Sequence, residues 1–70
     1  MNEKQKAKSL LILSQNKITD YQFDGEKFSF LFEDIGILKG NKIKTYILEP
    51  IDENTIGTFA DGECRNVWTV

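Results

Sequence analysis

The closing segment of the chain, Phe59–Val70, contains its only cysteine, its only arginine and its only tryptophan. A cysteine becomes a nucleophile when its thiol pKa is lowered and a general base lies beside it. The sequence contains no histidine, so the usual partner base is missing. Cys64 follows the turn signal Asp61-Gly62, and a tight hairpin there would place it opposite Phe59. We therefore expect Cys64 to be a small buried hydrophobe with an unreactive thiol.

The acidic residues include two adjacent pairs, Glu33-Asp34 and Asp52-Glu53, in stretches that we predict to be loops. Acid–base catalysis requires two carboxyl groups that face each other across a substrate and differ in pKa. Adjacent residues in exposed loops do not provide that arrangement, and the spacing of a calcium-binding loop is absent. A zinc site needs several Cys or His ligands. The sequence thus predicts no catalytic residue, no metal site, no cofactor and no enzymatic activity.

A group of lysines surrounds the dipeptide Gly40-Asn41, namely Lys39, Lys42 and Lys44, and Tyr46 follows them. A hairpin with a basic tip and an aromatic residue on its stem can bind phosphate and stack a nucleic-acid base. Lysines at a sheet edge also prevent aggregation between strands. The acidic isoelectric point of about 5.0 argues against general affinity for nucleic acids. A nucleic-acid-binding small β-barrel is therefore the alternative function.

The composition is that of one small globular domain, with 70 residues, 40% hydrophobic residues and a net charge of −2. The longest apolar run, Leu10–Leu13, is far shorter than the roughly 20 residues of a membrane span. The basic start of the chain precedes this short run without a cleavage site, so we expect no signal peptide. One cysteine cannot form an internal disulfide. These features predict a cytoplasmic protein that does not associate with membranes.

Turn signals divide the rest of the chain into strands. Asp24-Gly25, Gly40-Asn41 and Asp61-Gly62 are each typical of a two-residue hairpin turn between antiparallel strands. The runs between them are rich in β-branched and aromatic residues, and Pro50 is expected to end one strand. The spacing predicts a curved antiparallel meander of five or six strands.

The turns also predict which residues share a face of the sheet. Phe28, Phe30 and Phe32 recur at period two and form a buried face. In the third hairpin, a two-residue turn pairs Thr58 with Arg65. The same register pairs Ile56 with Val67 and places Trp68 on the side of Phe59.

The N-terminal residues favour a helix over about residues 3–16. Asn2 is a suitable N-cap, and the stretch after it lacks β-branched residues. The helical face is predicted from Ala7, Leu10, Leu11 and Ser14. The fold class is then α+β, with the helix packed on the sheet. The alternative is an all-β small barrel in which residues 8–13 form the first strand.

Apolar residues occur on both faces of several predicted strands. With Ile56 they include Leu31, Leu48 and Val67, and together the apolar residues are more than a domain of this size readily buries, so the helix, a second copy or another protein should cover the excess. These three residues are the predicted protein-binding site. The function expected first is a non-catalytic intracellular protein-binding module, such as a small adaptor, inhibitor or regulator, that acts through a sheet face or edge. Self-association is the other form that this binding could take.

Overall fold

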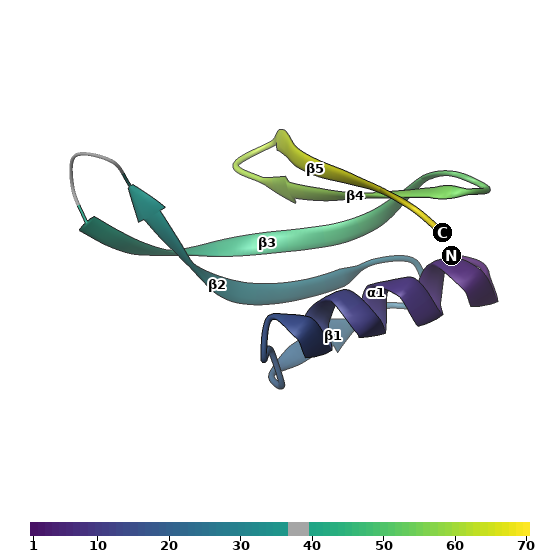
Figure 1. Cartoon of the computed structure of the whole chain (residues 1–70), viewed down its shortest axis with the longest axis horizontal. Helices are drawn as coiled ribbons and strands as arrows, with labels where there is room; N and C mark the ends of the chain where they lie inside the picture. Colours follow the sequence, from purple (N-terminus) through teal and green to yellow (C-terminus); the bar gives the residue numbers. More distant parts are fainter. Residues whose placement is uncertain (37–39) are drawn as a thin grey trace.

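The computed structural model describes the backbone of residues 1–36 and 40–70 and the side chains of residues 1–33 and 43–70. One helix precedes a sheet of five strands in the order β1-β2-β3-β4-β5, and every pair of neighbours is antiparallel (Figure 1). The elements are α1 (Glu3–Gln15), β1 (Tyr21–Phe23), β2 (Phe28–Gly36), β3 (Gly40–Asp52), β4 (Thr55–Ala60) and β5 (Glu63–Thr69). The sheet is open, with β1 and β5 at its edges. The α+β meander is confirmed, and the all-β barrel is wrong because residues 8–13 are helical.

The start of α1 is fixed by a capping box. The side chain of Asn2 accepts a hydrogen bond of 2.9 Å from the backbone of Gln5, whose side chain accepts one of 2.8 Å from Asn2. The side-chain amide of Gln5 also donates to the backbone carbonyls of Asp52 and Thr55. These bonds fasten the first turn of the helix to the connection between β3 and β4.

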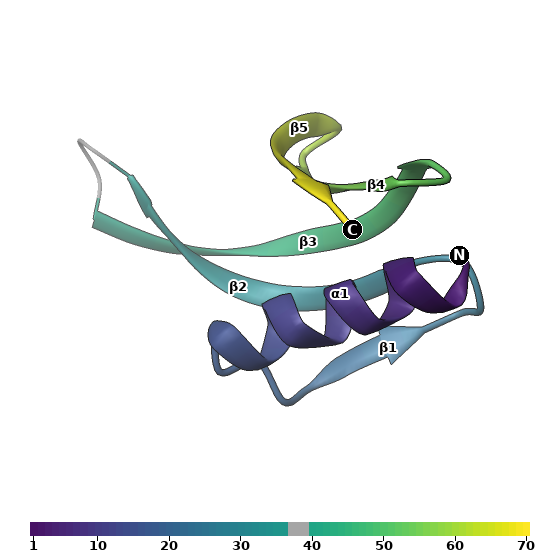
Figure 2. The same cartoon turned by 45° about the vertical axis from the view of Figure 1, so that its right-hand side comes forward.

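The buried face of α1 differs from the predicted one. It consists of Gln5, Ser9, Ile12 and Leu13, whereas Leu11 is half exposed. Gln5 is the physical reason, because its bonds to the sheet turn its own side of the helix inward. The long β2–β3 hairpin projects beyond the helix, which therefore covers only part of this side of the sheet (Figures 1 and 2).

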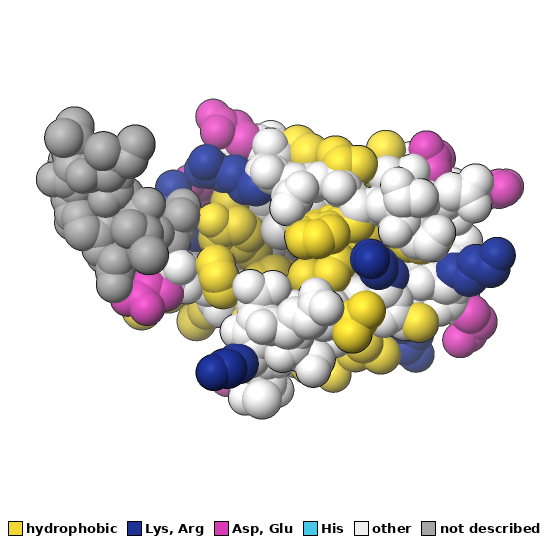
Figure 3. All heavy atoms as spheres, in the orientation of Figure 1, with side chains coloured by type: hydrophobic (Ala, Val, Ile, Leu, Met, Phe, Trp, Pro, Cys, Tyr) yellow, Lys and Arg dark blue, Asp and Glu magenta, His cyan; other side chains and the backbone are white. Residues whose placement is uncertain are grey.

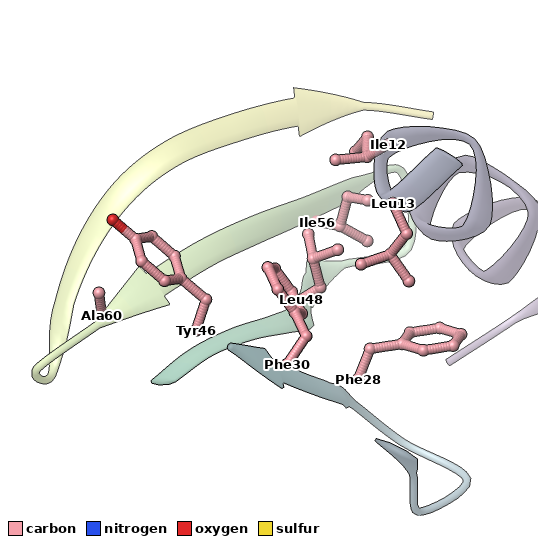
Figure 4. Packing of buried hydrophobic residues seen from close by; sticks show 8 residues of the cluster. All are labelled: Ile12, Leu13, Phe28, Phe30, Tyr46, Leu48, Ile56 and Ala60. Carbon is pink, nitrogen blue, oxygen red and sulfur yellow. The ribbon is translucent and has the colours of Figure 1, made fainter. Parts of the chain in front are cut away.

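The core lies between α1 and the side of the sheet that faces it, here called the inner face. Its residues come from the helix and from β2, β3 and β4: Ile12, Leu13, Phe28, Phe30, Tyr46, Leu48, Ile56 and Ala60 (Figure 4). The predicted burial of Phe28 and Phe30 is confirmed, whereas Phe32 packs at the margin of the core.

The first hairpin has a longer turn than predicted. Phe23 pairs with Phe28, and Tyr21 with Phe30, so residues 24–27 form the connection. The carboxylate of Asp24 accepts hydrogen bonds of 2.9 Å from the backbone of Glu26 and Lys27 and stabilises this loop. The register moves by two residues, which preserves the alternation of faces. Tyr21 and Phe23 consequently stay on the same side of the sheet as Phe28 and Phe30.

The second hairpin corrects three predictions. Gly40 pairs with Gly36 inside the ladder, so Gly40-Asn41 belongs to β3 and is not the predicted two-residue turn, and residues 37–39 lie outside the described residues. Glu33-Asp34 lies in β2 and not in a loop. Pro50 does not end β3, because a register shift between Pro50 and Asp52 carries the strand on to Asp52.

The third hairpin begins as predicted and then shifts. Positive φ angles of 54° at Asp61 and 76° at Gly62 form the tight turn, and Phe59 pairs with Cys64. The register then shifts, so that Thr58 pairs with Asn66 and not with Arg65. Arg65 is the extra residue of a β-bulge. The bulge also changes the partners of the residues that follow.

Beyond the bulge, Ile56 pairs with Trp68, and Gly57 pairs with Val67. Trp68 therefore packs against the core on the inner face, and its predicted place beside Phe59 is wrong.

Candidate functional site

Cys64 is exposed, and the prediction of a buried thiol is wrong. It lies opposite Phe59, as expected, but on the side of the sheet that α1 does not cover. Its sulfur is 3.5 Å from the backbone carbonyl oxygen of Asn66. Among the described residues, no group of three or more Cys, Asp or Glu side chains is arranged to hold a metal ion.

The structure does not assemble the described part of the predicted nucleic-acid site at the surface. The ammonium of Lys44 forms an ion pair of 3.0 Å with Asp61. Tyr46 is only 7% exposed, and its ring packs on Phe30 and Phe32 with centroid distances of 5.9 and 5.5 Å. The ring of Tyr46 therefore belongs to the core and is not presented on an exposed hairpin stem, where the prediction placed it.

The structure does not describe the side chains of the other two lysines of that prediction. Lys39 lies outside the described residues. Lys42 pairs with Asp34 along the β2–β3 ladder, and only its backbone is described.

The predicted protein-binding residues fall on opposite sides of the sheet. Leu48 is fully buried beneath α1, so its predicted place on the binding surface is wrong. Leu31 and Val67 are 65% and 55% exposed on the side away from the helix. We call this side the outer face.

The outer face carries more apolar side chains than the sequence prediction identified. In addition to Leu31 and Val67 it presents Ile43, Ile47, Ile51 and Phe59, of which Ile43 is 74% exposed and Ile51 49%. Sequence analysis could have found this row, because Ile43, Ile47 and Ile51 recur every four residues and so lie on one side of a strand. The expected break at Pro50 hid its last member.

Register connects these side chains across the strands. Leu31 pairs with Thr45, which stands between Ile43 and Ile47 on the same side of β3. Ile47 in turn pairs with Phe59 on β4. The apolar residues therefore form one continuous surface from β2 to β4.

Gly57 lies on β4, between paired residues of β3 and β5. A Cβ atom at Gly57 would lie 2.7 Å from the ring of Phe59 and 2.8 Å from the Cδ1 methyl of Ile51. Both side chains thus close over the glycine, which pairs with Val67 on one side and Glu49 on the other. This glycine allows the apolar surface to continue onto β5.

The helix of the described structure lacks the length and apolar character needed to cross a membrane. Comparison of the chain with protein-family models, with curated proteins and with solved structures gave no match.

Proposed function

We propose that the chain is a non-catalytic protein-binding module, of the kind used as small adaptors, inhibitors and regulators, and that it docks its partner on the outer face. The observation that carries this proposal is the exposure of four large aliphatic side chains on one side of the sheet. They are Leu31, Ile43, Ile51 and Val67, each between 49% and 74% exposed. An exposed Leu alone needs no explanation, but a contiguous group marks an interaction site.

Among the described residues, no helix packs on the outer face. The helix α1 packs on the inner face, where it covers Leu48 and Ile56. Covering the outer face by a partner would remove apolar surface from water, which is favourable by about 25 cal/mol per Å² before the entropic cost of association is subtracted.

Charge favours a different protein over a second copy. Glu49 lies in the outer face beside Gly57, and no Lys or Arg is among the strand residues that the described structure places on this side. A two-fold dimer would join this surface to itself and so set the carboxylate against strand residues that include no Lys or Arg. A partner with an apolar surface bordered by Lys or Arg would complement it.

The remaining features agree with this reading. The nucleic-acid alternative gains no support, because Tyr46 is in the core and Lys44 is engaged by Asp61. The exposed free thiol of Cys64 suits a reducing compartment, so the cytoplasm stays the proposed location.

The test is affinity capture from a lysate of the native host with three immobilised chains: the parent, Ile51→Ser/Val67→Ser, and the control Leu11→Ser on the exposed side of α1. Circular dichroism should first show that all three are folded. A protein retained by the parent and the control after nuclease treatment, but lost from the double variant, is the expected result. Equal retention by the double variant, or sedimentation of the purified parent as a dimer that this variant abolishes, would contradict the proposal.

A further inference from the structure

A hollow of about 190 Å³ opens on the inner face, between the C-terminal end of α1 and β5. Aromatic side chains from three strands line it: Phe30, Phe32, Tyr46 and Trp68. Hydrophobic atoms are visible in the middle of the helix-bearing side of the molecule (Figure 3). This hollow lies on the opposite side of the sheet from the outer face, so its use is independent of the proposed function.

The wall of the hollow is held in place by ordered contacts. The indole nitrogen of Trp68 donates a hydrogen bond of 2.8 Å to the hydroxyl of Thr58. The rings of Phe30 and Tyr46 stack nearly parallel, at 21°, and Phe32 meets Tyr46 edge-on. A flat ligand would therefore meet a preformed apolar wall, which reduces the entropic cost of binding.

The β-bulge supplies the polar mouth of the hollow. Consecutive residues of a regular strand point to opposite faces, yet Arg65 and Asn66 both line the hollow because the bulge sets two residues against one. Among the described residues that line the hollow, Arg65 is the one with a charged side chain, and none of them is Asp or Glu. Its guanidinium forms an ion pair of 3.9 Å with the carboxylate of Glu63, a distance too long for a hydrogen bond, so a ligand carboxylate within hydrogen-bond distance would compete with a weak contact.

The volume suits a ligand with one ring. A dry cavity of about 150 Å³ is enough to bind benzene, whereas drug-sized ligands occupy roughly 300–1,000 Å³. The hollow of about 190 Å³ lies just above the first value.

We propose that this hollow binds a small molecule with one aromatic ring and one carboxylate. The ring lies against Trp68, over a floor formed by the largely buried rings of Phe30 and Tyr46. The carboxylate reaches the guanidinium of Arg65 and the side-chain amide of Asn66. Arginine is suited to this role, because its planar donors match the two oxygens of a carboxylate.

The test uses 3-phenylpropionate as the probe and 3-phenylpropanol as its neutral control. Trp68 is the only tryptophan, so its fluorescence and its single indole N–H resonance report directly on the wall of the hollow. Saturable changes in both signals are expected, with the carboxylate binding about tenfold more tightly than the alcohol. Arg65→Gln should remove this difference. The matched change Lys4→Gln, at the exposed start of α1, should leave it intact.

The outer-face variant Ile51→Ser/Val67→Ser should bind the probe as the parent does, which separates this site from the proposed docking surface. Three results would each overturn the assignment. These are no saturable response of Trp68 at millimolar probe, equal affinities for the acid and the alcohol, and a preference for the acid that survives in Arg65→Gln.

Discussion

The thiol of Cys64 is free and exposed, because its side of the sheet is the uncovered outer face. We expect a thiol reagent to label it in the folded protein about as fast as in the protein unfolded by urea. Cys64→Ser should change the free energy of unfolding by no more than about 0.5 kcal/mol, as at other surface positions. Labelling that begins only when the chain unfolds would show that the thiol is covered.

The charge of Asp24 contributes to the stability of the first hairpin. The backbone N–H groups of Lys27 and Glu26, in that order, lower the pKa of Asp24 below its ordinary value of 3.8. A carboxyl whose pKa is lower in the folded state stabilises the fold above its unfolded pKa and loses that effect as the pH falls through its folded pKa. Asp24→Ala should therefore be less stable than the parent at pH 7, and this difference should shrink below about pH 4.

Urea unfolding of the parent and of Asp24→Ala at pH 7 and pH 3 measures this effect. Asp52 provides a second test of the same effect. The hydroxyl of Thr55 and the backbone N–H of Asn54 lower its pKa in the connection between β3 and β4. Asp52→Ala should follow the same trend. A loss of stability in Asp24→Ala that is the same at both pH values would mean that the charge of the carboxylate has no part in it.

Only one side of α1 packs on the sheet. Shortening a side chain on each side of the helix tests which side that is. Leu13→Ala should lower the free energy of unfolding by about 2–5 kcal/mol, because Leu13 is buried among sheet residues. Leu11→Ala should cost less than about 1 kcal/mol, since its side chain is half exposed. Thermal and urea denaturation of both variants compares the two faces, and a greater loss in Leu11→Ala would restore the face predicted from sequence.

Local signals predicted the elements of this fold, and tertiary contacts decided how they face each other. The helix and its cap were predictable because Asn2 and Gln5 are near neighbours in the sequence. The side that it buries was not, because it depends on bonds from Gln5 to the carbonyls of Asp52 and Thr55, about fifty residues away. Hydrophobic periodicity counts only apolar residues, so it does not identify a buried side of the helix that contains a glutamine.

The same distinction applies to the strands and to the candidate site. The Asp61-Gly62 turn was correct, but nothing in a dipeptide signals the bulge at Arg65, which exchanges the faces of Val67 and Trp68. The exposure of Leu31 follows from simple alternation along β2. Leu48 alternates in the same way, and only the placement of α1 reveals that its side is the covered one.

The helix α1, with 13 residues, is too short to cover both sides of the five-stranded sheet. The inner face uses α1 to close its core and keeps a hollow beside Arg65, whereas the outer face keeps a continuous apolar surface. A chain of 70 residues is only marginally stable by itself. A partner bound to the outer face would add stability that rises with the logarithm of its concentration relative to its Kd.

The most direct test of the outer-face proposal is methyl NMR of the isotope-labelled chain during titration with the protein that affinity capture identifies. Methyl groups of isoleucine, leucine and valine are present on both sides of the sheet, so one spectrum reports on each. We expect shifts or broadening at Leu31, Ile43, Ile51 and Val67, with little change at Leu13, Leu48 and Ile56. Changes confined to the methyl groups of α1 and the inner face, with those four signals unmoved, would contradict the proposal that the outer face binds the partner.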